Sequence, residues 1–324
     1  MSRYSSFNPT HGLDRAPVMF TAATVIVLAT AFACAVKSDD QSAQNEQKPV
    51  ATAEPVVVTK PDTATGDVEP LLVIPENVSF ATAESTYNDR RYREATSMFE
   101  VYVQRRPDNA WGHYMLGLSA WKAGELGVSR TAFERSLEID PKHVKSLINL
   151  SRVLLEQEQP KEALARINTA LEIDSASAEV HRVAGRVHTA LGDRDAAIAS
   201  YRVALSLDST DVWSMNNMGL ILIQQGRFDE ALPPLARAVQ LKPGSPVFQN
   251  NLGVALERTG HFALARETYQ AAIAADSSYA KASVSLARVT GLTDDPSAEP
   301  LELAQLAEQF ATEIRTSKVV GARF

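Results

Sequence analysis

The fold is decided by residues 212–245, which read VWSMNNMGLILIQQGRFDEALPPLARAVQLKPGS. Small and large apolar residues recur there at helical spacing in two runs, which are separated by Gly226-Arg227 and ended by Lys242-Pro243-Gly244. This pattern predicts two antiparallel helices joined by a tight turn. One such hairpin cannot bury its own apolar faces, so it needs neighbours on both sides.

Steps of 34 residues from this stretch reach residues of the same size in both directions. The small residues aligned with Gly219 are Ala83, Gly117, Ser151, Gly185 and Gly253, and the bulky ones aligned with Leu235 are Phe99, Phe133, Ile167, Tyr201 and Tyr269. Small residues are expected where helices cross closely, and bulky ones where the next hairpin docks. A period kept without insertion over six units predicts a repeat protein.

At these residues the chain resembles the tetratricopeptide repeat family, whose pattern is a large residue, Leu-Gly, Tyr, then Ala, Phe, Ala and Pro. The resemblance covers six units and the first helix of a seventh at 280–290. It implies an all-α fold, a right-handed α-solenoid of helix-turn-helix repeats, and a protein or extended-peptide partner, because the family mostly binds peptides and proteins. The expected units are 76–109, 110–143, 144–177, 178–211, 212–245 and 246–279.

Several positions depart from the family pattern. The third unit has Glu158 and Pro160 where Gly and an aromatic residue are usual, so its inner turn is expected to differ. Pro233 and Pro234 are expected near the start of a second helix, where missing N–H groups cost little. Residues 291–324 are expected to form a loop, a helix over 300–315 and a tail. That helix is predicted to cap the last repeat, with partner binding as the alternative.

The chain begins with a polar stretch, residues 1–15, interpreted as a cytoplasmic n-region, before an uncharged apolar run at 16–36. About 20 apolar residues span a bilayer, so the run is predicted to be a signal peptide or a transmembrane anchor. Cys34, the only cysteine, follows Thr30-Ala31-Phe32-Ala33, which resembles the lipobox of bacterial lipoproteins and makes Cys34 a candidate lipidation site. Ala31-Phe32-Ala33 also resembles an ordinary signal-peptidase site. In each case the repeats are expected on the periplasmic side.

Residues 37–75 are rich in Pro, Thr, Ser, Gln and acidic residues and show no helical period, so they are predicted to be a disordered tether. Two apolar clusters at 56–58 and 71–74 are exceptions. They either dock on the first hairpin, pair with a partner strand, or form an unpaired apolar patch.

Composition and motifs indicate a binding protein. A net charge of −7 and a pI of about 5.5 argue against nucleic acid as a partner. No phosphate-binding loop, nucleophile elbow or carboxylate pair is present. His181 and His188 lie on one helix face, but no third metal ligand lies between them. The chain is therefore expected to be no enzyme and to hold no metal, cofactor or small-molecule substrate.

The first helix of each unit is expected to line a concave groove. Three asparagines at the sixth position of their units, Asn149, Asn217 and Asn251, form a partial ladder, with Asn216 and Asn250 beside them. An asparagine side chain offers a donor and an acceptor, so it can pair with the backbone of any extended peptide. The alternative is that asparagine merely fits a crowded helix surface.

Aromatic and basic residues are predicted on the same face. Trp111, Tyr114 and Trp213 are candidate anchors for a bound chain. The basic residues there include Lys145, Arg152, Arg182 and Arg186. They favour a ligand with acidic groups; the alternative is that they are simply solvated. The sequence thus predicts a membrane-tethered extracytoplasmic scaffold that binds protein segments during assembly of a cell-envelope complex. A self-associating structural element is the alternative.

Overall fold

The computed structural model describes residues 56–57, 73–294, 296 and 300–321. The expected n-region, the apolar run with Cys34 and most of the expected tether lie outside them. Among the described residues, no helix combines the length and apolar character that a membrane span requires.

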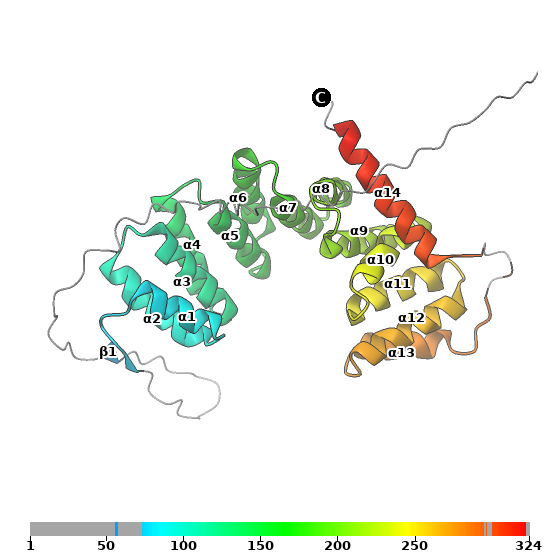
Figure 1. The fold of residues 1–324 in the computed structure, drawn as a ribbon, viewed down its shortest axis with the longest axis horizontal. Coiled ribbons are helices and arrows are strands. Elements are labelled where there is room, and N and C mark those ends of the chain that lie inside the picture. The colour runs from blue at the N-terminus through cyan, green and yellow to red at the C-terminus, as the bar shows by residue number, and fades with distance from the viewer. Residues whose placement is uncertain (1–55, 58–72, 295, 297–299, 322–324) are drawn as a thin grey trace, which may run out of the picture. The chain divides into compact units, whose positions relative to one another are not determined.

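Six antiparallel helix pairs follow one another along the chain (Figure 1). They are α1 (Phe80–Asn88) with α2 (Tyr92–Arg105), α3 (Ala110–Lys122) with α4 (Leu126–Ile139), α5 (Val144–Glu156) with α6 (Pro160–Ile173), α7 (Ala178–Leu191) with α8 (Arg194–Leu207), α9 (Val212–Gln224) with α10 (Phe228–Leu241), and α11 (Pro246–Arg258) with α12 (Phe262–Ala275). The first helix of a seventh pair, α13 (Ala280–Val289), and a final helix, α14 (Leu303–Gly321), complete the described part. From α1 to α13 each helix packs on the next, and first helices of successive repeats also touch. The predicted all-α solenoid is confirmed.

From the second unit on, each first helix begins at the residue where the sequence period starts a unit. In the second to sixth units the residue before that helix supplies the cap, because its side chain accepts a hydrogen bond from a backbone N–H two or three residues further on. The capping residues are Asn109, His143, Ser177, Asp211 and Ser245. These bonds satisfy N–H groups that the first turn of a helix leaves without partners.

The turn inside each repeat has one conformation throughout. Gly124, Gly192 and Gly226 have φ angles of 82°, 80° and 75°, and Glu158 of the third repeat has a φ of 59°. The expectation of a different turn in that repeat is therefore wrong. The packed helices impose the left-handed conformation on Glu158, where a Cβ atom disfavours it. Pro160 is the first residue of α6, where a missing N–H costs little.

Small and bulky residues meet inside each hairpin. A Cβ atom added to Gly117, Gly185, Gly219 or Gly253 would lie 2.5–2.7 Å from a side chain of the following helix. Those side chains are Phe133, Tyr201, Leu235 and Tyr269. The bulky residue thus packs against the glycine of its own hairpin, a contact that the sequence analysis assigned to the next hairpin.

Two prolines lie deeper in α10 than expected. Pro233 and Pro234 are inside the helix, past its first turn, and Pro234 is buried. Their missing N–H groups therefore remove two hydrogen bonds that this helix would otherwise make.

A short β-ladder precedes the first helix. Strand β1 (Val56–Val57) pairs antiparallel with β2 (Val73–Ile74), with Val56 opposite Ile74. The Ile74 side chain is buried, and β2 packs on α2. The described end of the expected tether therefore belongs to the folded unit and docks on the first hairpin.

Helix α14 turns back along the solenoid. It lies over α10 and α8, the second helices of the fifth and fourth repeats, instead of the last repeat that the sequence predicted (Figure 1). Ala307, Phe310, Ala311 and Ile314 are buried in this contact side. The buried apolar residues of the described chain form two clusters, one from Ile74 to Val187 and the other from Ala197 to Ile314.

Candidate functional site

The surface made by the first helices α3, α5, α7, α9, α11 and α13 carries the predicted groove residues; we call it the first-helix face. Its neighbouring helices are joined by side-chain hydrogen bonds. Trp121 Nε1 donates to Glu156 Oε1 at 3.0 Å, and Arg152 Nη2 donates to Glu179 Oε1 at 2.6 Å. The predicted inward positions therefore lie side by side from one repeat to the next.

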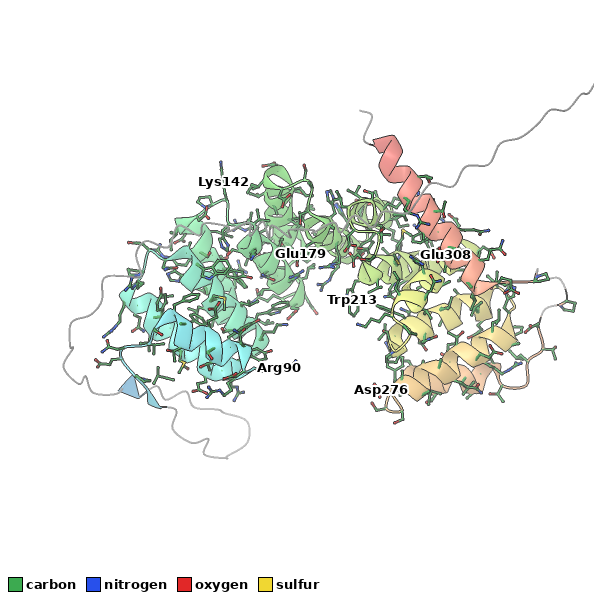
Figure 2. The ribbon with its side chains drawn as sticks, viewed as in Figure 1. Arg90, Lys142, Glu179, Trp213, Asp276 and Glu308 are labelled. Carbon is green, nitrogen blue, oxygen red and sulfur yellow. The ribbon has the colours of Figure 1, made fainter. Side chains whose placement is uncertain are left out.

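Trp111 and Trp213 occupy equivalent places at the starts of α3 and α9, and both are exposed, by 39% and 47%. The Trp111 ring lies 4.8 Å from that of Tyr114, and the Lys145 ammonium is 5.1 Å from the Trp111 centroid. Trp213 (labelled in Figure 2) has the same kind of surroundings, with Phe248 at 5.1 Å and the Lys242 ammonium at 5.0 Å. Both indoles are held in place with one side open to solvent, which suits an apolar ligand group.

Three of the predicted asparagines hydrogen-bond to one another, and one of these bonds crosses the contact between α9 and α11. Asn251 Nδ2 donates to Asn216 Oδ1 at 2.9 Å, and Asn216 Nδ2 donates to Asn217 Oδ1 at 3.4 Å. Asn217 and Asn251 are half-buried, whereas Asn216 and Asn250 are buried. The Oδ1 atom of Asn250 is buried with no hydrogen-bond partner among the described residues. It is therefore an acceptor in need of a donor.

Asn149 makes its hydrogen bonds within the protein and is not part of a ladder open to a ligand. It is buried, its Nδ2 donates to Lys145 O at 3.0 Å, and its Oδ1 accepts from Arg152 Nη1 at 2.9 Å. Buried Tyr114 lies beside it, with its hydroxyl 3.5 Å from Asn149 Nδ2. Asn149 thus orients the Arg152 guanidinium, and both Asn149 and Tyr114 are too buried to offer much surface to a ligand.

Two of the four predicted basic residues on this face are neutralised by acidic partners. Arg152 pairs with Glu179, and Arg182 pairs with Asp211 at 3.2 Å and Glu179 at 3.7 Å. Figure 2 labels Glu179 on α7. Arg186, one turn after Arg182, has no hydrogen bond or ion pair among the described residues.

Arg186 is exposed to solvent and lies near a second guanidinium group, that of Arg152. Desolvation lowers the pKa of Arg186, and the nearby Arg152 guanidinium lowers that pKa further. Burial also raises the pKa of Tyr201, so that hydroxyl stays neutral beside Arg186. An anion bound at this point would relieve the repulsion between the two guanidinium groups.

Family models described as tetratricopeptide repeat match residues 80–144 and 216–280, residues 120–187, and residues 179–211. The chain belongs to the tetratricopeptide repeat family. No curated protein sequence matches it.

Solved structures share the tetratricopeptide repeat fold with this chain. The Pseudomonas aeruginosa pilF structure has 18% identity and a TM-score of 0.53, and the match covers 64% of this chain and 91% of that one. A chain of the APC/C hetero-tetramer Cut9-Hcn1 has 16% identity and a TM-score of 0.56, over 74% of this chain and 47% of that one. YrrB, described as a TPR protein with an unusual peptide-binding site, has 21% identity and a TM-score of 0.46, over 57% and 96%.

The structure adds residues that the sequence analysis of this tetratricopeptide repeat protein did not name. Leu220, Val247 and Val284 are exposed on α9, α11 and α13, and Val284 reaches 65%. They occupy the ninth, second and fifth positions of their units, so the 34-residue register contained the signal. Among the described residues no group of His, Cys, Asp or Glu has the arrangement of a metal site.

Proposed function

We propose that this tetratricopeptide repeat protein binds an extended segment of a partner protein along its first-helix face. Nine large apolar side chains of the described residues are strongly exposed, and the observation that carries the proposal is that five of them lie on first helices. They are Trp111, Trp213, Leu220, Val247 and Val284. Exposed apolar groups concentrated on one face indicate a surface for a partner.

Three kinds of contact follow from the side chains on this face. Trp213, Leu220 and Val284 offer apolar contacts from α9 to α13. The half-buried side chains of Asn217 and Asn251 can pair with the backbone of the bound segment. Arg186 can bind a carboxylate, which gives the segment an acidic group at the level of α7. The expected ligand is therefore an extended segment that carries one acidic residue and has apolar residues on one side of it along the chain.

We further propose that the chain acts outside the cytoplasm as a membrane-tethered scaffold in the assembly of a cell-envelope complex. Support for this step comes from the sequence alone: the uncharged run 16–36 with Cys34 near its end. Mass spectrometry of the mature N-terminus tests it. A diacylglyceryl-modified Cys34 supports a lipoprotein and an intact Met1 a signal anchor, whereas cleavage without a lipid leaves the chain without its proposed tether.

Site-specific photocrosslinking tests partner binding. A photoreactive residue at Leu220 on the first-helix face is compared with one at Ile173, near the end of a second helix, because both side chains are 38% exposed. We expect a discrete crosslinked protein from position 220 and none from position 173. The Arg186→Gln variant should weaken that crosslink several-fold. Equal crosslinking from both positions would count against the first-helix face as the binding surface.

Self-association is a second candidate, and one observation favours it. Helix α13 has no second helix packed beside it in the manner of the six complete repeats, and its Val284 is 65% exposed. A second copy docked on α13 would bury that side chain. Sedimentation analysis of the full chain decides the matter: a dimer that Val284→Lys dissociates supports this alternative, whereas a monomer at high concentration removes it.

A further inference from the structure

Helix α14 shows how this chain binds a helix on its opposite surface, the second-helix face formed by α2, α4, α6, α8, α10 and α12. Glu308 of α14 (labelled in Figure 2) accepts hydrogen bonds from Arg237 Nη1 at 2.8 Å and Gln240 Nε2 at 3.2 Å, both on α10. Arg202 of α8 lies 3.8 Å from Glu313. Ala307, Phe310, Ala311 and Ile314, spaced as one face of a helix, are buried.

The corresponding place on the second repeat is an open pocket. Arg135 and Glu138 of α4 stand three repeats before Arg237 and Gln240 in the 34-residue register. They line a surface pocket of about 590 Å³ between α3 and α4. Its other lining residues are His113, Leu116, Gly127, Val128, Thr131, Ala132 and Glu134.

The pocket is open because of the side chains that the second repeat places there. Gly127 stands where the fifth repeat has Asp229, and a Cβ atom on Gly127 would meet nothing within 4 Å. Leu116 and Ala132 provide buried apolar surface at this place. His113 adds an uncharged ring, because burial lowers its pKa. The contact of its Nε2 with Pro107 O at 3.0 Å acts in the opposite direction but is the weaker effect. The pocket thus combines an apolar floor with a charged rim.

The charge on the rim distinguishes this pocket from the α14 site. Glu138 replaces the neutral Gln240, and Arg135 is shared between Glu138 at 2.8 Å and Asp108 at 3.9 Å. Glu134 also lines the pocket. A carboxylate in the position that Glu308 has on α10 would therefore lie next to Glu138, and the two negative charges would repel each other. A basic side chain in that position would pair with Glu138 or Asp108.

We infer that the α3–α4 pocket is a second docking site, which binds an amphipathic helix of a partner protein. The partner helix carries apolar residues at the spacing of Ala307, Phe310, Ala311 and Ile314, and a lysine or arginine in the position of Glu308. The inference rests on the internal equivalence with the α14 contact and on charge complementarity. It is independent of ligand binding on the first-helix face.

Two synthetic peptides with the sequence of residues 301–316 test the inference, one unchanged and one with Glu308→Lys. Each is titrated into the full-length chain, with fluorescence anisotropy for affinity and hydrogen–deuterium exchange for location. We expect the Glu308→Lys peptide to bind roughly fivefold more tightly, the effect of about one surface charge pair. It should protect amides of α4. The Glu138→Lys variant of the protein should reverse the preference between the two peptides.

A pocket-filling variant provides the control. A Cβ atom at Gly127, which lines the pocket, would meet nothing within 4 Å, so Gly127→Leu should leave the thermal stability unchanged or slightly raised and weaken binding of the Glu308→Lys peptide at least tenfold. The inference is overturned if neither peptide binds, if both bind equally, or if protection appears on α8 and α10 instead of α4.

Discussion

At the residue scale, the contact between a glycine and a bulky residue fixes how closely the two helices of a repeat approach. A Cβ atom on Gly253 would lie 2.5 Å from the Tyr269 ring, closer than real Cβ contacts allow. We predict that Gly253→Ala destabilises the protein by about 1–3 kcal/mol, because the extra methyl group overpacks the hairpin. Gly127→Ala, on a helix surface with no atom within 4 Å, should leave stability equal or slightly raised. Urea unfolding of both variants measures the difference.

The turns between the two helices of each repeat allow a test in the opposite direction, in which a substitution should stabilise the protein. Glu158 has a φ of 59°, whereas glycine occupies the same turn position at Gly192 and Gly226. We predict that Glu158→Gly raises the free energy of unfolding by about 1 kcal/mol, because the left-handed conformation penalises a Cβ atom. Gly226→Glu should lower it by a similar amount. A stability loss on Glu158→Gly would mean that this side chain makes a contact worth more than the strain.

A hydrogen-bonded group near the end of the solenoid predicts a dependence on pH. Arg288 Nε and Nη2 lie 2.6 and 2.7 Å from the Glu257 carboxylate, and the Tyr269 hydroxyl donates to it at 2.8 Å. Desolvation by itself raises the pKa of Glu257, but the bonds from Arg288 and Tyr269 outweigh it, so the pKa lies below its usual value.

Because the folded pKa of Glu257 is lowered, its contribution to stability is present above the unfolded pKa of about 4.3 and is lost as the pH falls through the folded value. We predict that Glu257→Gln lowers stability by about 1–2 kcal/mol at pH 7. The lower figure is expected, because Arg288 is half-exposed and solvent screens its charge. The two proteins should converge in acid. Melting temperatures measured from pH 7 down to pH 2.5 check this, and a difference independent of pH would contradict the assignment.

At the element scale, α14 is held by one apolar face on α8 and α10. Phe310 is buried in this contact, whereas Gln309 is exposed on the same helix. We predict that Phe310→Ala costs about 3–5 kcal/mol and increases hydrogen exchange in α8, α10 and α14. Gln309→Ala should behave like the unmodified protein. Unchanged protection of α10 in Phe310→Ala would show that α14 contributes little to the fold.

At the scale of the whole molecule, stability should be local. The buried apolar residues of the described chain form two clusters, which divide between Val187 and Ala197, and helices pack on near neighbours in sequence except for α14. We predict that Phe310→Ala leaves amide exchange in α2–α5 unchanged and that Phe133→Leu leaves α9–α12 unchanged, because a repeat array transmits energy through nearest-neighbour contacts. Exchange mass spectrometry checks both. Uniform destabilisation by either change would indicate one cooperative core.

The candidate site followed from the sequence only in part. The period placed Trp111, Trp213 and Arg186 on the first helices, because helical spacing fixes which side of a helix a residue occupies. It did not show that Asn216 and Asn251 bind each other, or that Glu179 neutralises Arg152. Those contacts join residues about one repeat apart, and their distances depend on how successive hairpins pack.

The sequence by itself determined the repeat, the start of each first helix from the second unit on, and the all-α solenoid. These features depend on local capping and on a period that every unit shares, so they are contained in each 34-residue stretch. Only the tertiary structure decided the burial of Ile74 against the first hairpin and the return of α14 to α8 and α10. The physical reason is that each depends on surfaces brought together from separate parts of the chain, which no single repeat encodes.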